Sequence, residues 1–345
     1  MDRGTVNTRI IKRSILKHIA RTEPVGTTVG TDYSVVDRGA SPFAIITAQG
    51  FSEYNAEMAY IRALNNLAAG GTSADSIIVD IQAEAYYSED QLRREMNRLS
   101  ELSHSRNIRI IGGNTTYMKY GGHGASFTIT AFGKVEESVL SQLTEKLTVG
   151  DRIVIIGDSG RYGASLIVER ARREFGNEQE NLTMDLNKNL SFLDRFAKSY
   201  LDGAVMDVNE CYIQKTAKAL VDGGVSYIHD VSFGGIYRTL TEIAEYSGRG
   251  IDIVHEQVPI RQDTIEICEF TGINPYELLG TGGVVAVVKP DKLEELEEHL
   301  REAGIKYSIA GELTEAGERV VHSSNFHMKR SLTYYEVDAL YKVLN

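Results

Sequence analysis

The amino-acid sequence predicts an α/β (α+β) protein with two domains. Helical and strand-like patterns alternate along the chain, as expected for domains in which helices pack against sheets. The length of 345 residues is sufficient for about two domains with separate cores. The segment "VGDRIVIIG" has the pattern of a turn followed by a buried strand, which is expected where a second domain begins. We therefore place a domain boundary near Thr148. The two predicted domains are residues 1–148 and 149–345.

The first domain is predicted to begin with an amphipathic surface helix in the segment "RIIKRSILKHIA". Four basic residues of this segment are expected on its solvated face: Lys12, Arg13, Lys17 and His18. Further helices are expected over 53–71 and from Ser88 to about Leu102, where Ser88 and Gln91 form a capping box. Strands are expected at 43–50, at 75–84 and in the runs "NIRIIGG" and "ASFTITAFGKV".

The second domain continues the alternation after its first strand. Helices are predicted over 209–222, 235–247 and 291–303, and a polar segment over 176–189. Predicted strands are "VSYIHDV", "IDIVHE", "GVVAVVK" and "YSIAGEL", and the chain closes with a short amphipathic helix, "YYEVDALYKVL".

Composition excludes several classes of protein. The net charge of −11 is unfavourable for nucleic-acid binding, which needs a basic face. No apolar run is long enough for a membrane span. Cys211 and Cys268 are interpreted as buried reduced thiols, which suits the cytoplasm. Paired histidines at zinc-ligand spacing and a serine-nucleophile motif are both missing.

A glycine-rich stretch follows the first strand of the second domain. In "IVIIGDSGRYGASLIVERA" the spacing of Gly157, Gly160 and Gly163 is G-x-x-G-x-x-G. A dinucleotide site has G-x-G-x-x-G and an acidic residue after the next strand. We therefore favour a tight strand-to-helix turn and keep a dinucleotide site as an alternative.

Polar residues stand beside several Gly-Gly pairs. Asn114 follows Gly112 and Gly113 at the expected end of a strand, and His229 and Asp230 precede Gly234 and Gly235. Glycine allows a backbone to approach a ligand closely. The recurrence of such pairs favours a phosphate-handling cleft, although any one pair is explained by a turn. Asp230 is suited either to capping the next helix or to binding a cation, and capping is favoured from this residue alone.

The order and spacing of these motifs resemble the AIR synthase (PurM-like) superfamily. The acidic segment "DxxVV" appears as "TDYSVV", "NDLAAMG" as "NNLAAGG", "GGDT" as "GGNT" and "HDxxxGGL" as "HDVSFGGI". The stretch "VPIRQDTIEICEFTGINPYELLGTGGVVAVV" is most similar to the HypE-like branch. The resemblance covers nearly the whole chain.

The resemblance implies an architecture and a chemistry. The N-terminal α/β domain would form a barrel-like interface in a homodimer, and the C-terminal domain would be α+β. ATP would bind between the domains with Mg²⁺ held by aspartates, and its γ-phosphoryl group would pass to an oxygen. Carried over by position, the metal ligands are Asp32, Asn66 and Asn114. The nucleotide would lie near four glycines and a His-Asp pair: Gly112, Gly113, Gly234, Gly235, His229 and Asp230.

This chain departs from the family pattern in two respects. Asn66 and Asn114 replace acids, and an amide oxygen ligates Mg²⁺ without adding charge, so a weakened site is expected. The HypE type carries its substrate on a C-terminal cysteine, whereas this sequence ends "LYKVLN" and has no cysteine after Cys268. Carbamoyl dehydration on a terminal thiol is therefore not expected.

Two functions follow as hypotheses. The first is an ATP-binding enzyme that transfers a phosphoryl group to an unknown small molecule or activates one of its oxygens, with catalytic residues that the sequence does not identify. The second is a catalytically degenerate dimer that serves as a nucleotide sensor or as a scaffold for a protein partner. No nucleic-acid or membrane partner is expected in either case.

Overall fold

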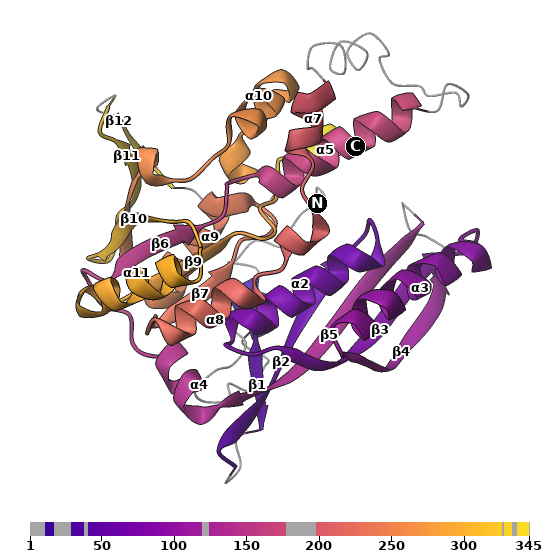
Figure 1. Ribbon diagram of the computed structural model, residues 1–345, viewed down its shortest axis with the longest axis horizontal. Coiled ribbons are helices and arrows are strands. Elements are labelled where there is room, and N and C mark those ends of the chain that lie inside the picture. The colour runs from indigo at the N-terminus through magenta and orange to yellow at the C-terminus, as the bar shows by residue number, and fades with distance from the viewer. Residues whose placement is uncertain are drawn as a thin grey trace.

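The computed structural model describes residues 11–16, 29–37, 41–118, 124–176, 198–325, 328–332 and 337–344. Its strands form two sheets, one from each half of the chain (Figure 1). No helix of the described residues is long and apolar enough to cross a membrane.

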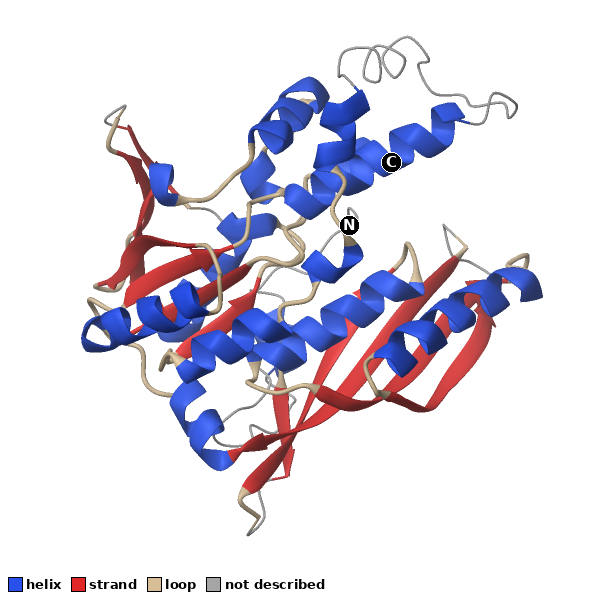
Figure 2. Ribbon diagram, viewed as in Figure 1, coloured by secondary structure: helices blue, strands red, loops and turns tan. Residues whose placement is uncertain are grey.

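The first sheet has the strand order β1-β2-β5-β3-β4. Its only parallel pair is β3 with β4, and the other neighbours are antiparallel. The strands are β1 (Ser34–Asp37), β2 (Phe43–Ser52), β3 (Ala74–Glu84), β4 (Arg109–Met118) and β5 (Ala125–Glu136). Two helices, α2 (Ala56–Ala69) and α3 (Glu89–Ser105), cover one face of this sheet (Figure 2).

An N-terminal cap fixes the start of helix α2, and a close contact with β2 fixes its position on the sheet. The side chain of Asn55 caps the helix by accepting a hydrogen bond of 2.7 Å from the N–H of Met58. The helix crosses β2 at Gly50, where an added Cβ would stand 2.1 Å from the carbonyl oxygen of Ala59. Only glycine allows this close approach, and the apolar face of α2 therefore packs directly on the sheet.

The opposite face of the first sheet exposes apolar side chains. Along β2 the even-numbered residues are buried, whereas Phe43, Ile45 and Phe51 are 45%, 38% and 45% exposed. Strand β4 is exposed along almost its whole length and forms an edge of the sheet. Apolar sheet surface of this kind marks an interaction face.

The second sheet has the order β12-β11-β8-β10-β6-β9-β7. Its strands are β6 (Arg152–Ile156), β7 (Tyr227–Asp230), β8 (Gly250–Val254), β9 (Val284–Val288), β10 (Tyr307–Thr314), β11 (Arg319–Ser323) and β12 (Met328–Ser331). Successive side chains of β6 point to opposite faces of the sheet. Ile153 and Ile155 belong to the apolar cluster on one face, and Val154 and Ile156 belong to the cluster on the other. Both faces of the sheet are therefore covered.

Helices supply the rest of these cores. Helix α9 (Gly235–Ser247) packs on one face of the second sheet, and α8 (Gln214–Asp222) and α11 (Leu293–Glu302) pack on the other. Helix α2 contributes Ala68 and Ala69 to the cluster that contains α8, so it lies between the two sheets (Figure 1). The remaining helices are α4 (Glu137–Leu143), α5 (Arg161–Gly176), α7 (Lys198–Ala204), α10 (Gln262–Thr271) and α12 (Tyr341–Leu344), with short turns η1 (Ile11–Ile15), η3 (Val208–Cys211), η4 (His255–Gln257), η5 (Pro275–Glu277) and η6 (Pro290–Lys292).

The glycine-rich stretch after β6 is a packed turn. An added Cβ at Gly160 would stand 2.5 Å from the carbonyl oxygen of Pro275, and one at Gly163 would stand 2.4 Å from the side chain of Leu278. Close packing against Pro275 and Leu278 of the same chain therefore explains these glycines without a bound dinucleotide.

Most predicted elements are confirmed, including α2, the capping box of α3 and the strands β6 to β10. Two predictions are wrong. Strand β4 does not end at Gly112 and Gly113 but continues to Met118, and the predicted helix 209–222 is divided into η3 and α8. The first residues of the predicted closing helix, 334–336, lie outside the described residues, and within 337–344 only α12 is helical. Strands β11 and β12 were not predicted. Of the basic residues in the N-terminal segment, Lys17 and His18 lie outside the described residues, as do 177–189.

Candidate functional site

The two halves of the chain meet at a buried cluster of titratable side chains. Asp32 lies two residues before β1, and His229 and Asp230 end β7, an edge strand of the second sheet. One potential ligand atom from each of the three lies within 4.8 Å of the others. His229 and Asp230 are 4% and 2% exposed. His229 and Asp230 of the predicted His-Asp motif thus form one site with Asp32, which lies far upstream in the sequence.

His229 is the centre of this cluster. Its Nδ1 lies 2.8 Å from the carbonyl oxygen of Asp230 and 3.1 Å from Oδ2 of Asp32. Its Nε2 lies 3.4 Å from Oε2 of Glu242, on α9. The backbone N–H of Asp230 also donates to Oδ2 of Asp32, at 3.2 Å. The imidazole therefore stands between two carboxylates contributed by different parts of the chain.

The carboxylates determine the protonation of His229. Burial by itself would lower its pKa, but Asp32 and Glu242 outweigh burial and raise the pKa to about 10. Burial raises the pKa of Asp32, opposed by the positive charge of His229. The pair therefore retains a proton at neutral pH, and the imidazolium is the state that satisfies both of its carboxylate neighbours.

Glu242 is the ionised member of the cluster. Burial would raise its pKa, but the contacts with His229 and Arg238 lower it to about 2. The Nε of Arg238 donates to Oε1 of Glu242 at 2.9 Å, in an i,i+4 arrangement along α9. A guanidinium and an imidazolium thus compensate the buried carboxylate.

The cluster has the donors for a divalent cation. Oδ2 of Asp230 is buried and has no hydrogen-bond partner within the described part of the chain, which is costly unless something binds there. Carboxylate oxygens of Asp32 and Asp230 would hold the ion, and hard oxygen ligands suit Mg²⁺. Its positive charge would compete with the proton of the Asp32–His229 pair, so binding would release a proton.

In the predicted metal set of Asp32, Asn66 and Asn114, the two amides have hydrogen-bond partners of their own. The amide of Asn66 donates to the carbonyl oxygen of Gln49 at 2.6 Å. That of Asn114 donates to Oγ1 of Thr116 at 3.1 Å, inside β4. Strand β4 and the strand that follows Asp32 are opposite edges of the first sheet. Strand order therefore separates Asn114 from Asp32 within the first sheet, and the assignment of the three residues to one metal site stays a prediction.

Three of the four predicted glycines, Gly113, Gly234 and Gly235, have structural roles within the chain. Gly113 lies against β3, where an added Cβ would stand 1.9 Å from the carbonyl oxygen of Val79, whereas Gly112 has open space. Gly234 adopts the left-handed conformation (φ 83°) at the N-terminus of α9. At Gly235 an added Cβ would stand 2.6 Å from the carbonyl oxygen of Leu278.

Several residues around the cluster were not predicted from sequence. Glu242 and Arg238 are a helical i,i+4 pair, which is the one signal that sequence offered. Asp80 pairs across the strands with Asn114, so a carboxylate does stand beside that amide. Arg62 and Asp338 reach the start of α9 from remote segments and carry no sequence motif.

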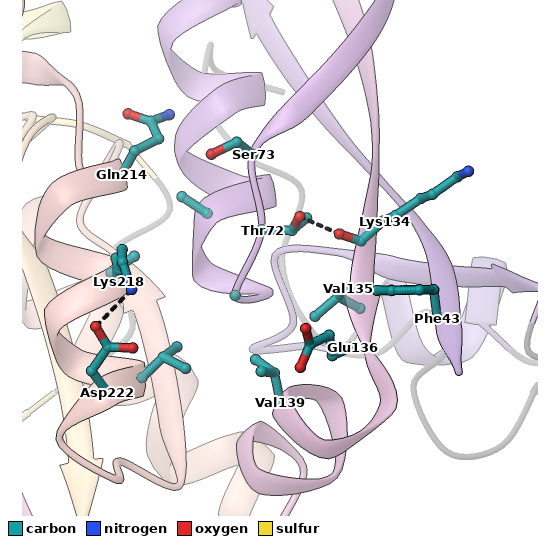
Figure 3. Close-up of a pocket in the computed structure, with 14 residues that line it drawn as sticks. Phe43, Thr72, Ser73, Lys134, Val135, Glu136, Val139, Gln214, Lys218 and Asp222 are labelled. Carbon is teal, nitrogen blue, oxygen red and sulfur yellow. Dashed lines mark hydrogen bonds and ion pairs between the residues drawn. The ribbon is translucent and has the colours of Figure 1, made fainter. Parts of the chain in front are cut away.

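A separate groove of about 670 Å³ opens between α2, β5, α4 and α8 (Figure 3). Its lining includes the apolar Ala68, Val139 and Val221 and the charged Lys218, which is paired with Asp222 at 2.7 Å. None of the residues that line the groove is a predicted site residue. The groove therefore does not compete with the buried cluster as the candidate site.

Comparisons with known proteins bear on the family and the fold. The family model described as AIR synthase related protein, C-terminal domain, matches residues 148–323. A carbamoyl dehydratase HypE of Bradyrhizobium diazoefficiens is 24% identical over 228 residues, which are 66% of this chain and 59% of that protein. The match therefore spans less than two thirds of that relative.

Solved structures share the fold. A hydrogenase maturation protein HypE in complex with ATP superposes with a TM-score of 0.65 at 19% identity, covering 97% of this chain and 96% of the other. The ThiL protein complexed with AMPPCP and TMP gives 0.57 at 15% identity, covering 90% and 93%. The fold is therefore PurM-like, and these identities support the fold alone.

The protonation of His229 makes stability dependent on pH. The unfolded chain loses the imidazole proton near pH 6.5, whereas the folded protein keeps it to about pH 10. The protonated His229 therefore adds its full contribution to the free energy of unfolding below pH 6.5. This contribution is lost as the pH rises toward 10, at up to about 1.4 kcal/mol per pH unit. Urea unfolding between pH 7 and 9 should show the loss, and His229→Gln should reduce the slope.

The same replacement at the exposed His104 is the control and should keep the wild-type slope. Equal slopes in all three proteins would contradict a charged His229.

Proposed function

Because the chain belongs to the AIR synthase-related protein family, we propose that it binds ATP with a divalent cation and activates an oxygen of a small molecule by phosphoryl transfer. The observation that carries the proposal is the cluster of Asp32, His229 and Asp230, where carboxylates from the two halves of the chain converge. A nucleotide between the halves would present its phosphates to this cluster. The relatives bound to ATP and AMPPCP support a nucleotide as the ligand.

The residues present suit a bound cation. Asp32 and Asp230 offer carboxylate oxygens, and the orphaned Oδ2 of Asp230 is a position where a cation would satisfy a buried charge. Mg²⁺ supplies charge neutralisation for phosphates when it is bound. His229 would hold Asp32 in place from its other side, and Arg238 would keep Glu242 ionised.

We also propose that the chain forms a homodimer through the open face of the first sheet. Phe43, Ile45 and Phe51 expose apolar surface there, and no described helix covers it. Asn114 stands opposite Asp80 in the β3–β4 ladder, on the face that alternates with the buried residues of β3. A second copy bound to this face would cover the apolar strip formed by Phe43, Ile45 and Phe51. It would also lie close to Asp80 and Asn114 of the first copy.

A second function is favoured by the two asparagines. If Asn66 and Asn114 stand where a catalytic protein needs acids, the dimer would bind nucleotide without turning it over, as a sensor or as a scaffold for a protein partner. The imidazolium of His229, which already supplies positive charge beside Asp32, is consistent with this alternative.

The first prediction concerns nucleotide binding. Calorimetry with ATP and Mg²⁺ should detect binding by the unmodified protein, and Asp230→Asn should weaken it at least about tenfold, since one charged ligand is lost. Asp252→Asn, on β8 and paired with His322, is the matched control and should bind as the wild type does. The absence of heat at millimolar ATP with folded protein would refute the proposal.

A second prediction separates the enzyme from the sensor. If the chain is an enzyme, the unmodified protein releases phosphate from ATP in the presence of Mg²⁺. If it is a sensor, phosphate release appears only in the double variant Asn66→Asp with Asn114→Asp, because the acids restore ligand charge. A malachite-green phosphate assay on both proteins at equal concentration decides between them.

A third prediction concerns the dimer. Light scattering after gel filtration should give twice the chain mass of 38.2 kDa for the wild type and a monomer for Ile45→Lys, because a charge would be buried in the apolar strip. Met328→Lys is the control, since Met328 is 64% exposed but belongs to the other sheet. A monomeric wild type at tens of micromolar would rule out this interface.

A further inference from the structure

The groove between α2, β5, α4 and α8 has the size and the place of a small-molecule site. Its volume of about 670 Å³ lies within the range of about 300–1,000 Å³ that ligand pockets occupy. Three of its walls, α2, β5 and α4, belong to the first half of the chain, and α8 belongs to the second. Pockets for small molecules occur preferentially at such junctions.

The floor of the groove is apolar and partly accessible. Ala68 and Ala217 are buried, whereas Val139 and Val221 are only half-buried. A molecule that covered these two valines would remove apolar surface from water, which is favourable. The body of a ligand for this groove is therefore expected to be apolar.

The walls are held in place before any ligand binds. Gly71 has a φ of 80°, and an added Cβ there would stand 2.6 Å from Cγ1 of Val139, so the turn after α2 packs directly on α4. The amide of Gln142, on α4, donates to the carbonyl oxygens of Val221 and Val225 at 2.9 Å and 3.0 Å, which ties α4 to the end of α8. A preformed groove needs little ordering when it binds a ligand.

Of the four charged residues that line the groove, Glu136 is the one that directs an unpaired charge into it. Lys218 is paired with Asp222 at 2.7 Å. Figure 3 shows that the side chain of Lys134 extends away from the groove, whereas the carboxylate of Glu136 lies on the side of β5 that faces α8. Glu136 is the N-cap residue of α4, but its side chain makes no capping bond, and it has no other partner in the described ranges.

Two further features of the groove favour a cation that donates hydrogen bonds. Helix α2 ends at Ala69, and Gly71 and Thr72 line the groove directly after it, so the negative end of the helix dipole lies beside the groove. The hydroxyl of Ser73 points across the groove toward α8 in Figure 3, and a hydroxyl oxygen accepts hydrogen bonds. The groove is therefore complementary to an ammonium group on an apolar body.

We propose that this groove is a binding site for a small organic amine. Its ammonium group pairs with the carboxylate of Glu136, and its apolar body covers Val139 and Val221. The inference goes beyond the proposed function and does not depend on it, because the groove shares no residue with the cluster of Asp32, His229 and Asp230.

The experiment uses phenethylamine as the probe and phenethyl alcohol as its neutral counterpart. In NMR spectra of protein labelled at its valine methyl groups, phenethylamine should shift the signals of Val139 and Val221 saturably in the millimolar range. The signals of Val320, on β11, are the internal control and should not move. Phenethyl alcohol should bind at least about threefold more weakly, because it has no charge to pair with Glu136.

A single carboxylate variant tests the ion pair. Glu136→Gln should weaken the binding of phenethylamine at least about threefold and leave that of phenethyl alcohol unchanged, since the shape of the groove is kept. Glu294→Gln, at an exposed position of α11, is the matched control and should bind both probes as the wild type does. Equal losses of both probes in Glu136→Gln, or no loss of either, would overturn the proposal.

The unmodified protein provides a test that does not depend on the folding of a variant. Signals of Val139 and Val221 that stay unchanged at tens of millimolar phenethylamine would overturn the inference. Binding of a capped Leu-Lys-Leu peptide without binding of the free amine would also overturn it, because the groove would then dock a protein segment. The ATP titration described above reports on the buried cluster alone, so either proposal can fail without the other.

Discussion

The contact of His229 with Asp32 on one side and Glu242 on the other is the interaction on which the candidate site depends. Three carboxylates converge there in a region that water hardly reaches, and such burial is expensive unless positive charge accompanies it. The imidazolium and the guanidinium of Arg238 provide that charge. The result is a rigid polar centre at the edge of the second sheet, to which the segment before β1 is attached.

Helix α2 couples this polar centre to the two cores. Its alanines let it lie close to β2 at Gly50 and also pack against α8, so it belongs to both halves of the molecule. The same helix carries Asn66 toward β2 and Arg62 toward the start of α9. A single helix therefore links the first sheet to the start of α9, and a shift of this helix would displace its contacts with both.

The agreement between prediction and structure varies with the kind of signal. Ser88 and Gln91 predict the start of α3 because a capping box is a local arrangement, complete within four residues. The two glycines before Asn114 are a misleading stop signal, because the hydrogen bonds of β4 with β3 carry the strand through them to Met118. The His-Asp motif was assigned to the site together with Asp32, and these three residues do meet. Asn66 and Asn114 were assigned with them, and their amides donate instead to Gln49 and Thr116.

By itself the sequence determined the alternation of helices and strands, the capping box of α3, the close-packed glycine turn after β6 and the family to which the chain belongs. It did not determine the cap of α9, because Asp338 and not Asp230 bonds the N–H of Gly234. These properties depend on periodicity and on short motifs, which a single chain displays without reference to its fold. The tertiary structure decided which polar groups meet. Asp32 reaches Asp230 across 198 residues, and Asp338 reaches Gly234 across 104. Such pairings follow from strand order and from the packing of α2 and α9, since the cost of burying charge is met only where the fold brings opposite charges and N–H donors together.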